Sequence, residues 1–254
     1  MPTAAPRATT RTWSACCCGS RCEDVAMNLR SPCLARIAAL LLAMPAVAFA
    51  LPPGFLDLRD TGPVHGNADA VRDRLEACSA CHGRDGVSPV PIFPSIGGMP
   101  VEYLYWQLVE FQREADPESP MTALVMTLGD QDLRDYATWY AAQKPVAPAA
   151  VDAVADERIA RIFREGDVAA GIPPCSGCHG ADAGGHPLAT SEPRYRLYPP
   201  LRGQHAAYLA QRLKDFRDGK NLVTSNDRIM HGVAEHISDE DAQALADWLQ
   251  AMAR

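Results

Sequence analysis

The sequence CSACH at residues 78–82 occurs a second time, with one change, as CSGCH at residues 175–179. The spacing C-x-x-C-H is typical of sites where haem c is attached to a protein. Two thiols add to the two vinyl groups on one edge of the porphyrin, and the adjacent histidine lies under the iron as its proximal ligand. The chain is therefore predicted to hold two covalently bound haem c groups. The predicted attachment residues are Cys78, Cys81, Cys175 and Cys178, and the predicted proximal ligands are His82 and His179.

The first 50 residues have the character of a removable leader. Residues 1–26 show no helical or strand period, whereas Met27 opens a segment with two arginines, an apolar run and an A-x-A sequence that ends at Ala50. The apolar run is shorter than the ~20 residues that span a bilayer. We predict that residues 1–26 are an upstream extension, that Met27 is the true start, and that a secretory signal peptide is cleaved after Ala50. An uncleaved anchor is the alternative.

Cleavage at this point would simplify the cysteine chemistry. Five of the nine cysteines lie in residues 1–50, and the remaining four all belong to the two C-x-x-C-H motifs. No thiol is then left for a structural disulfide or a nucleophile. A thioredoxin-like pair is disfavoured because no βαβ pattern surrounds it. A zinc site would have to unite two pairs that lie 97 residues apart.

Residues 51–254 are acidic, with 19 Lys and Arg against 29 Asp and Glu. A net charge near −10 argues against a nucleic-acid partner. No segment after residue 50 is long and apolar enough to cross a membrane. The length of this part fits two small domains or one of medium size.

Helical periodicity predicts an all-α chain in two parts. A lead-in over residues 51–67, rich in Pro and Gly, comes before the first part, and a Pro/Ala-rich linker over residues 144–154 separates the parts. The predicted helices cover residues 68–80, 101–114 and 130–142, then 156–166, 204–217 and 238–252. Ser238 is the predicted N-cap of the last helix, with Asp241 completing a capping box.

The second part repeats the first. Tyr103 aligns with Tyr208 and Trp139 with Trp248, while eight extra residues around residues 186–196 form a loop difference. The prediction is two tandem domains, at residues 68–143 (the first repeat) and 155–254 (the second repeat).

The repeat also selects a sixth ligand for each iron. Met121 lies seven residues before Leu128, and Met230 lies seven residues before its counterpart Ile237. A thioether at each position would complete His/Met ligation, which raises the reduction potential relative to bis-His ligation.

Other candidate ligands lack a counterpart in the opposite repeat. Neither Met99 nor Met126 aligns with a methionine, and neither His205, His231 nor His236 aligns with a histidine. They are set aside on that ground, and His65 is assigned to a solvated loop.

Two prolines stand at matching places, Pro94 before Ile96 and Pro199 before Leu201. A ligating histidine usually donates its other ring N–H to a carbonyl group, which fixes the ring. The Pro94 and Pro199 carbonyls are candidates for that role. The alternative is that these prolines only shape the loop.

These motifs resemble the dihaem class I cytochromes c, most closely the cytochrome c4 family. The likeness extends to FPSIGG at residues 93–98, GQHAAY at 203–208 and IMHGV at 229–233. It implies two cytochrome c (class I) domains related by a pseudo-twofold axis, and periplasmic electron delivery towards a terminal oxidase, often with loose membrane association. The first repeat departs from the pattern, because Met99-Pro100 stands where the second has Gln204-His205.

The expected function is a periplasmic electron carrier, not an enzyme, with protein redox partners and no small-molecule substrate. The donor would be a quinol–cytochrome c reductase-type complex or a dehydrogenase, and the acceptor a terminal oxidase. An alternative is the dihaem subunit of a larger periplasmic dehydrogenase complex. A dihaem peroxidase would need one open axial position, and the paired spacing of Met121 and Met230 argues against that.

Overall fold

The computed structural model describes residues 54–144, 156–220 and 222–252. The predicted leader and, apart from Lys144, the predicted linker lie outside these ranges. The described residues form helices and loops with no β-sheet, as the all-α prediction requires. Two isolated bridges join Leu56 to Thr224 and Asp167 to Ile172. In these same ranges no helix combines the length and apolar character that a membrane span requires.

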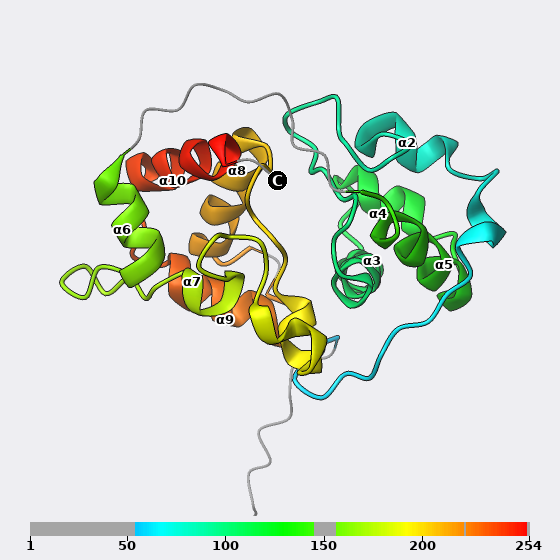
Figure 1. Ribbon diagram of the computed structural model, residues 1–254. Coiled ribbons are helices and arrows are strands. Elements are labelled where there is room, and N and C mark those ends of the chain that lie inside the picture. The colour runs from blue at the N-terminus through cyan, green and yellow to red at the C-terminus, as the bar shows by residue number, and fades with distance from the viewer. Residues whose placement is uncertain (1–53, 145–155, 221, 253–254) are drawn as a thin grey trace, which may run out of the picture. The chain divides into compact units, whose positions relative to one another are not determined.

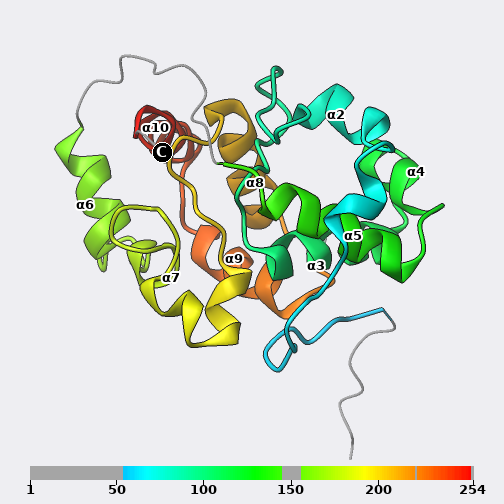
Figure 2. The same cartoon turned by 45° about the vertical axis from the view of Figure 1, so that its right-hand side comes forward.

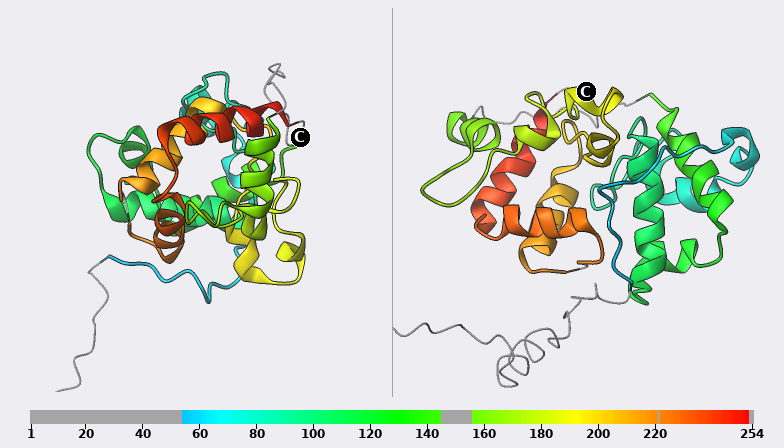
Figure 3. Two further views of the ribbon diagram at one scale, coloured as in Figure 1. Left: turned by 90° about the vertical axis from the view of Figure 1, so that its left-hand side faces the viewer. Right: turned by 90° about the horizontal axis from the view of Figure 1, so that it is seen from below.

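The helices of the two repeats follow one order. The first repeat comprises a 3₁₀ helix η1 (Ala68–Val71), α2 (Glu76–His82), α3 (Val101–Glu114), α4 (Pro120–Val125) and α5 (Asp130–Ala141) (Figure 1). The second comprises α6 (Glu157–Glu165), α7 (Ser176–His179), η2 (Pro187–Thr190), η3 (Pro193–Leu197), α8 (Ala206–Arg217), α9 (Ser225–Ala234) and α10 (Asp239–Ala251). Helix α3 packs on α5, and α8 packs on α10, so the corresponding pairs match (Figures 2 and 3).

Each repeat has its own hydrophobic core. The first core includes Val71, Leu75, Leu104, Leu133 and Tyr140, and the second includes Ile159, Phe163, Leu209, Leu245 and Leu249. The Phe163 ring is fully buried and lies 5.2 Å from the ring of Trp248. Two separate clusters of this kind are what a tandem pair of small domains requires, because each domain must bury its own apolar face.

Equivalent backbone hydrogen bonds confirm the alignment of the repeats. The Gly98 N–H donates to the Tyr140 carbonyl at 2.9 Å, and the Gly203 N–H donates to the Leu249 carbonyl at 2.7 Å. In both repeats this bond ties the loop that follows the C-x-x-C-H motif to the last helix. The loop is thereby fixed relative to the core.

The predicted helix over residues 68–80 is wrong in one respect, because the structure divides it into η1 and α2. The Arg74 N–H donates to the Val71 carbonyl at 2.8 Å and closes a 3₁₀ turn. The Tyr136 hydroxyl donates to the Arg74 carbonyl at 2.8 Å. That contact engages a carbonyl group that a continuous helix would pair with the N–H of Cys78.

The segment over residues 180–200, where no helix was predicted, contains the two 3₁₀ helices η2 and η3. Pro187 and Pro193 each open a 3₁₀ helix, where a missing N–H costs little. The ring of His186 stacks on Tyr195 at a centroid distance of 3.6 Å. Arg196 extends from this segment to Glu102 of α3 and forms an ion pair at 3.0 Å.

The lead-in is held to the second repeat before it reaches the first. The Leu56 N–H donates to the Val223 carbonyl at 2.7 Å, and the Ser225 N–H donates to the Leu56 carbonyl at 2.9 Å. Farther along, Val64 is buried in the first core. The predicted lead-in therefore contacts both repeats.

Side-chain caps begin helices α9 and α10 of the second repeat. The Ser238 hydroxyl accepts from the Asp241 N–H at 3.0 Å, which confirms the predicted N-cap. The Asp241 carboxylate accepts from Arg158 at 2.6 Å and does not bond back to the Ser238 N–H. The predicted capping box of α10 is therefore incomplete. A complete box, which the sequence analysis missed, starts α9. There Thr224 accepts from the Asp227 N–H at 3.0 Å, and the Asp227 carboxylate accepts from the Thr224 N–H at 2.8 Å.

This box allows a stability prediction. Thr224→Ala removes the hydroxyl group that satisfies the start of α9 and is expected to lower the free energy of unfolding by about 1–2 kcal/mol. Guanidinium denaturation of the oxidised protein measures the change. Thr224→Ser keeps the hydroxyl group and should retain most of the stability. Equal losses in both variants would contradict a capping role.

Candidate haem sites

In each repeat the C-x-x-C-H motif occupies about one helical turn. The motif forms the end of α2 in the first repeat, and in the second it forms α7 with Cys175 as the N-cap. Residues three and four positions apart share one face of a helix. Both thiols and the histidine therefore come to the same side, which is the arrangement that one porphyrin edge and its iron need.

A glycine ends each of these helices. Gly83 has a φ of 74° and Gly180 has a φ of 82°, a region that disfavours other residues. A Cβ at either position would also collide with a backbone carbonyl oxygen, that of Val87 or that of Gly185. Only glycine lets the chain turn directly behind the histidine.

The prolines lie where their carbonyl groups fix the imidazole rings. The His82 Nδ1 is 2.9 Å from the Pro94 carbonyl oxygen, and the His179 Nδ1 is 2.8 Å from the Pro199 carbonyl oxygen. A carbonyl oxygen can only accept, so Nδ1 carries the hydrogen. The Nε2 lone pair of each ring is then left for a metal ion.

Both imidazole rings are buried beside an aromatic ring. Phe93 lies 6.4 Å from His82, and Tyr198 lies 6.4 Å from His179, at equivalent places in the two loops. Burial lowers the pKa of His82 and of His179, partly offset by the hydrogen bond to the proline carbonyl. A lowered pKa keeps each ring neutral, which is the form that binds iron.

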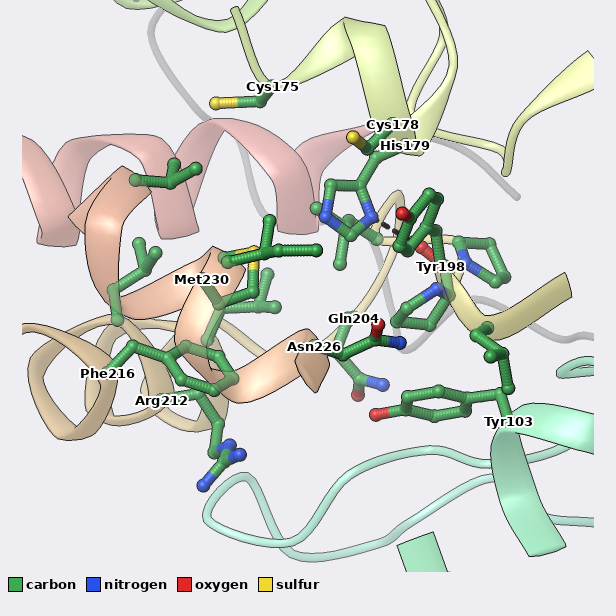
Figure 4. A pocket seen from close by; sticks show the side chains of 18 of the residues that line it. Tyr103, Cys175, Cys178, His179, Tyr198, Gln204, Arg212, Phe216, Asn226 and Met230 are labelled. Atoms are coloured by element: carbon green, nitrogen blue, oxygen red, sulfur yellow. Dashed lines mark hydrogen bonds between the residues drawn. The ribbon is translucent and has the colours of Figure 1, made fainter. Parts of the chain in front are cut away.

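The second motif opens onto an apolar cavity. Cys175, Cys178 and His179 line it from one side, and Met230 of α9 projects into it from another (Figure 4). Its apolar walls include Leu197, Leu209, Leu213, Phe216, Val233 and Leu245. Two thiols, a neutral imidazole and a thioether around an apolar cavity fit the requirements of haem c.

In the first repeat Met121 lies on α4, half-buried against the first core. Neither α4 nor α9 was predicted as a helix. Pro120 at the start of α4, and the T-x-x-D pattern at the start of α9, were signals in the sequence that could have found them. The two methionines thus come from equivalent short helices.

The rival ligands have other surroundings. Met126 is 55% exposed. The His231 Nδ1 is 2.6 Å from the Phe216 carbonyl oxygen. His205 is buried, with its Nε2 2.9 Å from the carbonyl oxygen of Ser88 in the first repeat. His236 is exposed.

The four thiols are free and partly buried. Burial raises the pKa of Cys175 to about 11 and also raises the pKa of Cys78 and Cys178. Burial therefore favours the neutral form of these three thiols before haem attachment. In the ranges that the structure describes, no three His, Cys, Asp or Glu side chains are placed to bind a metal ion by themselves.

A group of carboxyl groups that the sequence analysis missed lies between α3 and α9. Glu110 and Asp227 are buried, and Glu114 has one buried carboxyl oxygen without a hydrogen-bond partner. Burial, with the charges of Asp227 and Glu114, raises the pKa of Glu110 well above its usual range. Burial and the charge of Asp227 raise the pKa of Glu114 to about 7, while Arg212 acts in the opposite direction.

Comparisons with known proteins show the family to which the chain belongs. A family model described as cytochrome c matches residues 160–253. Cytochrome c4 of Stutzerimonas stutzeri is 37% identical over 208 residues, which is 78% of this chain and 95% of that protein. The chain belongs to the cytochrome c4 family. It is accordingly a dihaem electron-transfer cytochrome with two covalently bound haem c groups.

Two further comparisons extend this result, one to a solved structure and one to a relative of another name. The crystal structure of reduced recombinant cytochrome c4 from Pseudomonas stutzeri matches with a TM-score of 0.63 and 36% identity, over 74% of this chain and 99% of that one. A thiosulfate dehydrogenase electron acceptor of Thiomonas intermedia is 34% identical over 72% of this chain and 81% of its own length. The predicted fold of two tandem cytochrome c domains is confirmed.

The carboxyl group of Glu114 leads to a prediction on pH. Its pKa is raised from 4.5 to about 7, so the folded protein binds more protons than the unfolded chain between these values. The free energy of unfolding should therefore decline as the pH rises through this window. Glu114→Gln should remove that part of the decline and stabilise the protein at pH ~8 by on the order of 1 kcal/mol, since the side chain is only partly buried.

Denaturation curves of the oxidised protein across this pH range provide the measurement. Glu118→Gln changes an exposed carboxylate four residues later and serves as the control. Its pH dependence should follow that of the wild type. A Glu114→Gln variant with the same slope as the wild type would refute the assignment.

Proposed function

We propose that this protein carries electrons in the periplasm, one per haem, between a respiratory donor and a terminal oxidase or similar acceptor. The observation that carries the proposal is the second site, where two thiols, an imidazole and a thioether line one apolar cavity. With the imidazole and the thioether as its two axial ligands, the iron would have no position open for a substrate. The likeness to cytochrome c4 supports the same conclusion.

The ligand assignment within this proposal follows the repeat. Cys78 and Cys81 would attach the first haem, with His82 and Met121 as its axial ligands. The second haem would have Cys175 and Cys178 as attachment residues and His179 and Met230 as axial ligands. A haem held by these residues would supply one-electron chemistry, since its iron could take up and release one electron at a time. The apolar walls exclude water, and the Pro94 and Pro199 carbonyls hold the two imidazole rings.

Location in the periplasm is part of the proposal. The predicted signal peptide over residues 27–50 supports it. Expression with this segment should give a holoprotein whose N-terminus is Leu51. A mature protein that still carries the apolar run would instead support the uncleaved anchor.

A second candidate function is the electron acceptor of a periplasmic dehydrogenase. It is favoured by relatives named thiosulfate dehydrogenase electron acceptor, at 34% and 31% identity. The two functions differ in how the protein is isolated. A dehydrogenase subunit should co-purify with its partner in fixed stoichiometry from native periplasm, whereas a free carrier should not.

Electron transfer itself can be tested directly. The reduced protein, added to membranes that hold a cyanide-sensitive terminal oxidase, should be reoxidised at a rate that rises with its concentration and stops with cyanide. Oxidation that persists in cyanide, or rapid turnover of peroxide, would argue for a different function.

The axial methionines allow a spectroscopic prediction. Met230→Ala and Met121→Ala should each remove the far-red absorption band of one ferric methionine–iron bond and lower the reduction potential of one haem, because a thioether stabilises the ferrous state. Absorption spectra and a redox titration measure both changes. Met126→Ala, at an exposed position of the first repeat, is the control and should leave the spectrum unchanged. Loss of the band in Met126→Ala would show that the ligand of the first repeat is misassigned.

A further inference from the structure

One side chain of the second repeat reaches into the proximal loop of the first. The Gln204 Oε1 accepts from the Ser95 N–H at 2.8 Å, and the Gln204 Nε2 donates to the Ser95 carbonyl oxygen at 2.8 Å. Gln204 is 1% exposed and Ser95 is fully buried. A buried amide group satisfied in this way holds its partner in one place. Figure 4 shows Gln204 and Tyr103 at the edge of the second cavity.

The contact is made with the peptide group that holds the first proximal histidine. The Ser95 N–H and the Pro94 carbonyl belong to one peptide unit, and that carbonyl accepts from His82. A hydrogen bond at the N–H end of a peptide strengthens the acceptor at its carbonyl end. Gln204 therefore acts on His82 through a single peptide plane.

His205 contacts the other arm of the same loop. Its Nε2 donates to the Ser88 carbonyl oxygen at 2.9 Å. The Ser88 hydroxyl in turn donates to the carbonyl oxygen of Cys81, in the first C-x-x-C-H motif, at 2.7 Å. Two neighbouring residues of the second repeat thus hold both arms of the loop around the first haem.

The first repeat cannot make the reciprocal contact with the loop that holds His179 in the second repeat. Met99 stands in the place of Gln204, and Pro200 stands in the place of Ser95. A methionine has no amide group and a proline has no N–H. The pair that acts on His82 therefore cannot form at His179.

We propose that Gln204, assisted by His205, is a positioning residue for the first haem. Through these residues the second repeat sets the reduction potential of the first haem. The first repeat has no equivalent residues that act on the second haem in this way. The inference rests on the proposed ligation of iron by His82. A stronger acceptor at Pro94 gives the His82 ring more imidazolate character, which favours ferric iron. Gln204 therefore lowers the potential of the first haem.

The test is Gln204→Met, which places at position 204 the residue that the first repeat has at position 99. NMR during a redox titration resolves the two haems. We expect the equilibrium constant for reduction of the first haem to rise about threefold, or about 30 mV for a one-electron couple. The second haem should keep its potential. Equal shifts of both haems, or no shift of the first, would overturn the proposal.

Tyr103→Phe is the matched control, because it removes a hydroxyl group that interacts with Tyr208 of the second repeat and leaves the hydrogen bonds of Ser95 in place. The first haem should keep its potential in this variant. A shift as large as that of Gln204→Met would overturn the proposal, because it would show that any weakening of the contact between the two repeats has the same effect.

Hydrogen exchange gives a readout that does not depend on the variant. The Ser95 N–H of the wild type should exchange as slowly as the Ile96 N–H, which is bonded to the Gly86 carbonyl at 2.7 Å. Exchange at the rate of an exposed amide would overturn the proposal. If no ring protons of His82 show the large shifts that bonding to ferric iron causes in NMR spectra of the wild type, the ligation by His82 is refuted instead, so the two failures are distinguishable.

Discussion

The hydrogen bond between a histidine Nδ1 and a proline carbonyl is the interaction on which both haem sites depend. It fixes the tautomer of His82 and of His179, and so leaves Nε2 of each ring as the nitrogen that can bind iron. The bond can form only if the loop returns to the histidine 12 or 20 residues later. The glycine turn behind each histidine and the hydrogen bond from Gly98 or Gly203 to the last helix bring the loop back.

Much of this could be predicted from the sequence because the chemistry is local. Two thiols and a histidine within five residues define the attachment site, and helical periodicity located α3 and α10 within a residue or two. The comparison of repeats also selected Met121 and Met230 at equivalent positions, and the structure shows that both positions lie on short helices. The prolines were candidates for the same reason, since duplication preserves what each haem loop needs.

Contacts between distant segments were not predictable in the same way. Gln204 is an ordinary polar residue in the sequence, and only the fold brings it to Ser95, 109 residues away. Glu110 and Asp227 have the pattern of exposed helix residues until α3 and α9 bury them. The division of the first helix likewise depends on Tyr136, 62 residues from Arg74. Local propensity carries no information about such partners.

The differences between the repeats are concentrated where the repeats meet. The first repeat has Met99 where the second has Gln204, and the second repeat has Pro200 where the first has Ser95. The extra loop of the second repeat also supplies Arg196, which forms an ion pair with Glu102 of the first repeat. Two haems with the same ligands in the same fold would have nearly equal potentials, and electrons would have little preference for either. Because the proposed iron ligands are alike, any preference would have to come from their surroundings. In a duplicated protein, a difference between the repeats at their contact can give the two haems different reduction potentials, and electron transfer between the haems then has a preferred direction. The hydrogen bonds of Gln204 provide such a difference without a change of iron ligand.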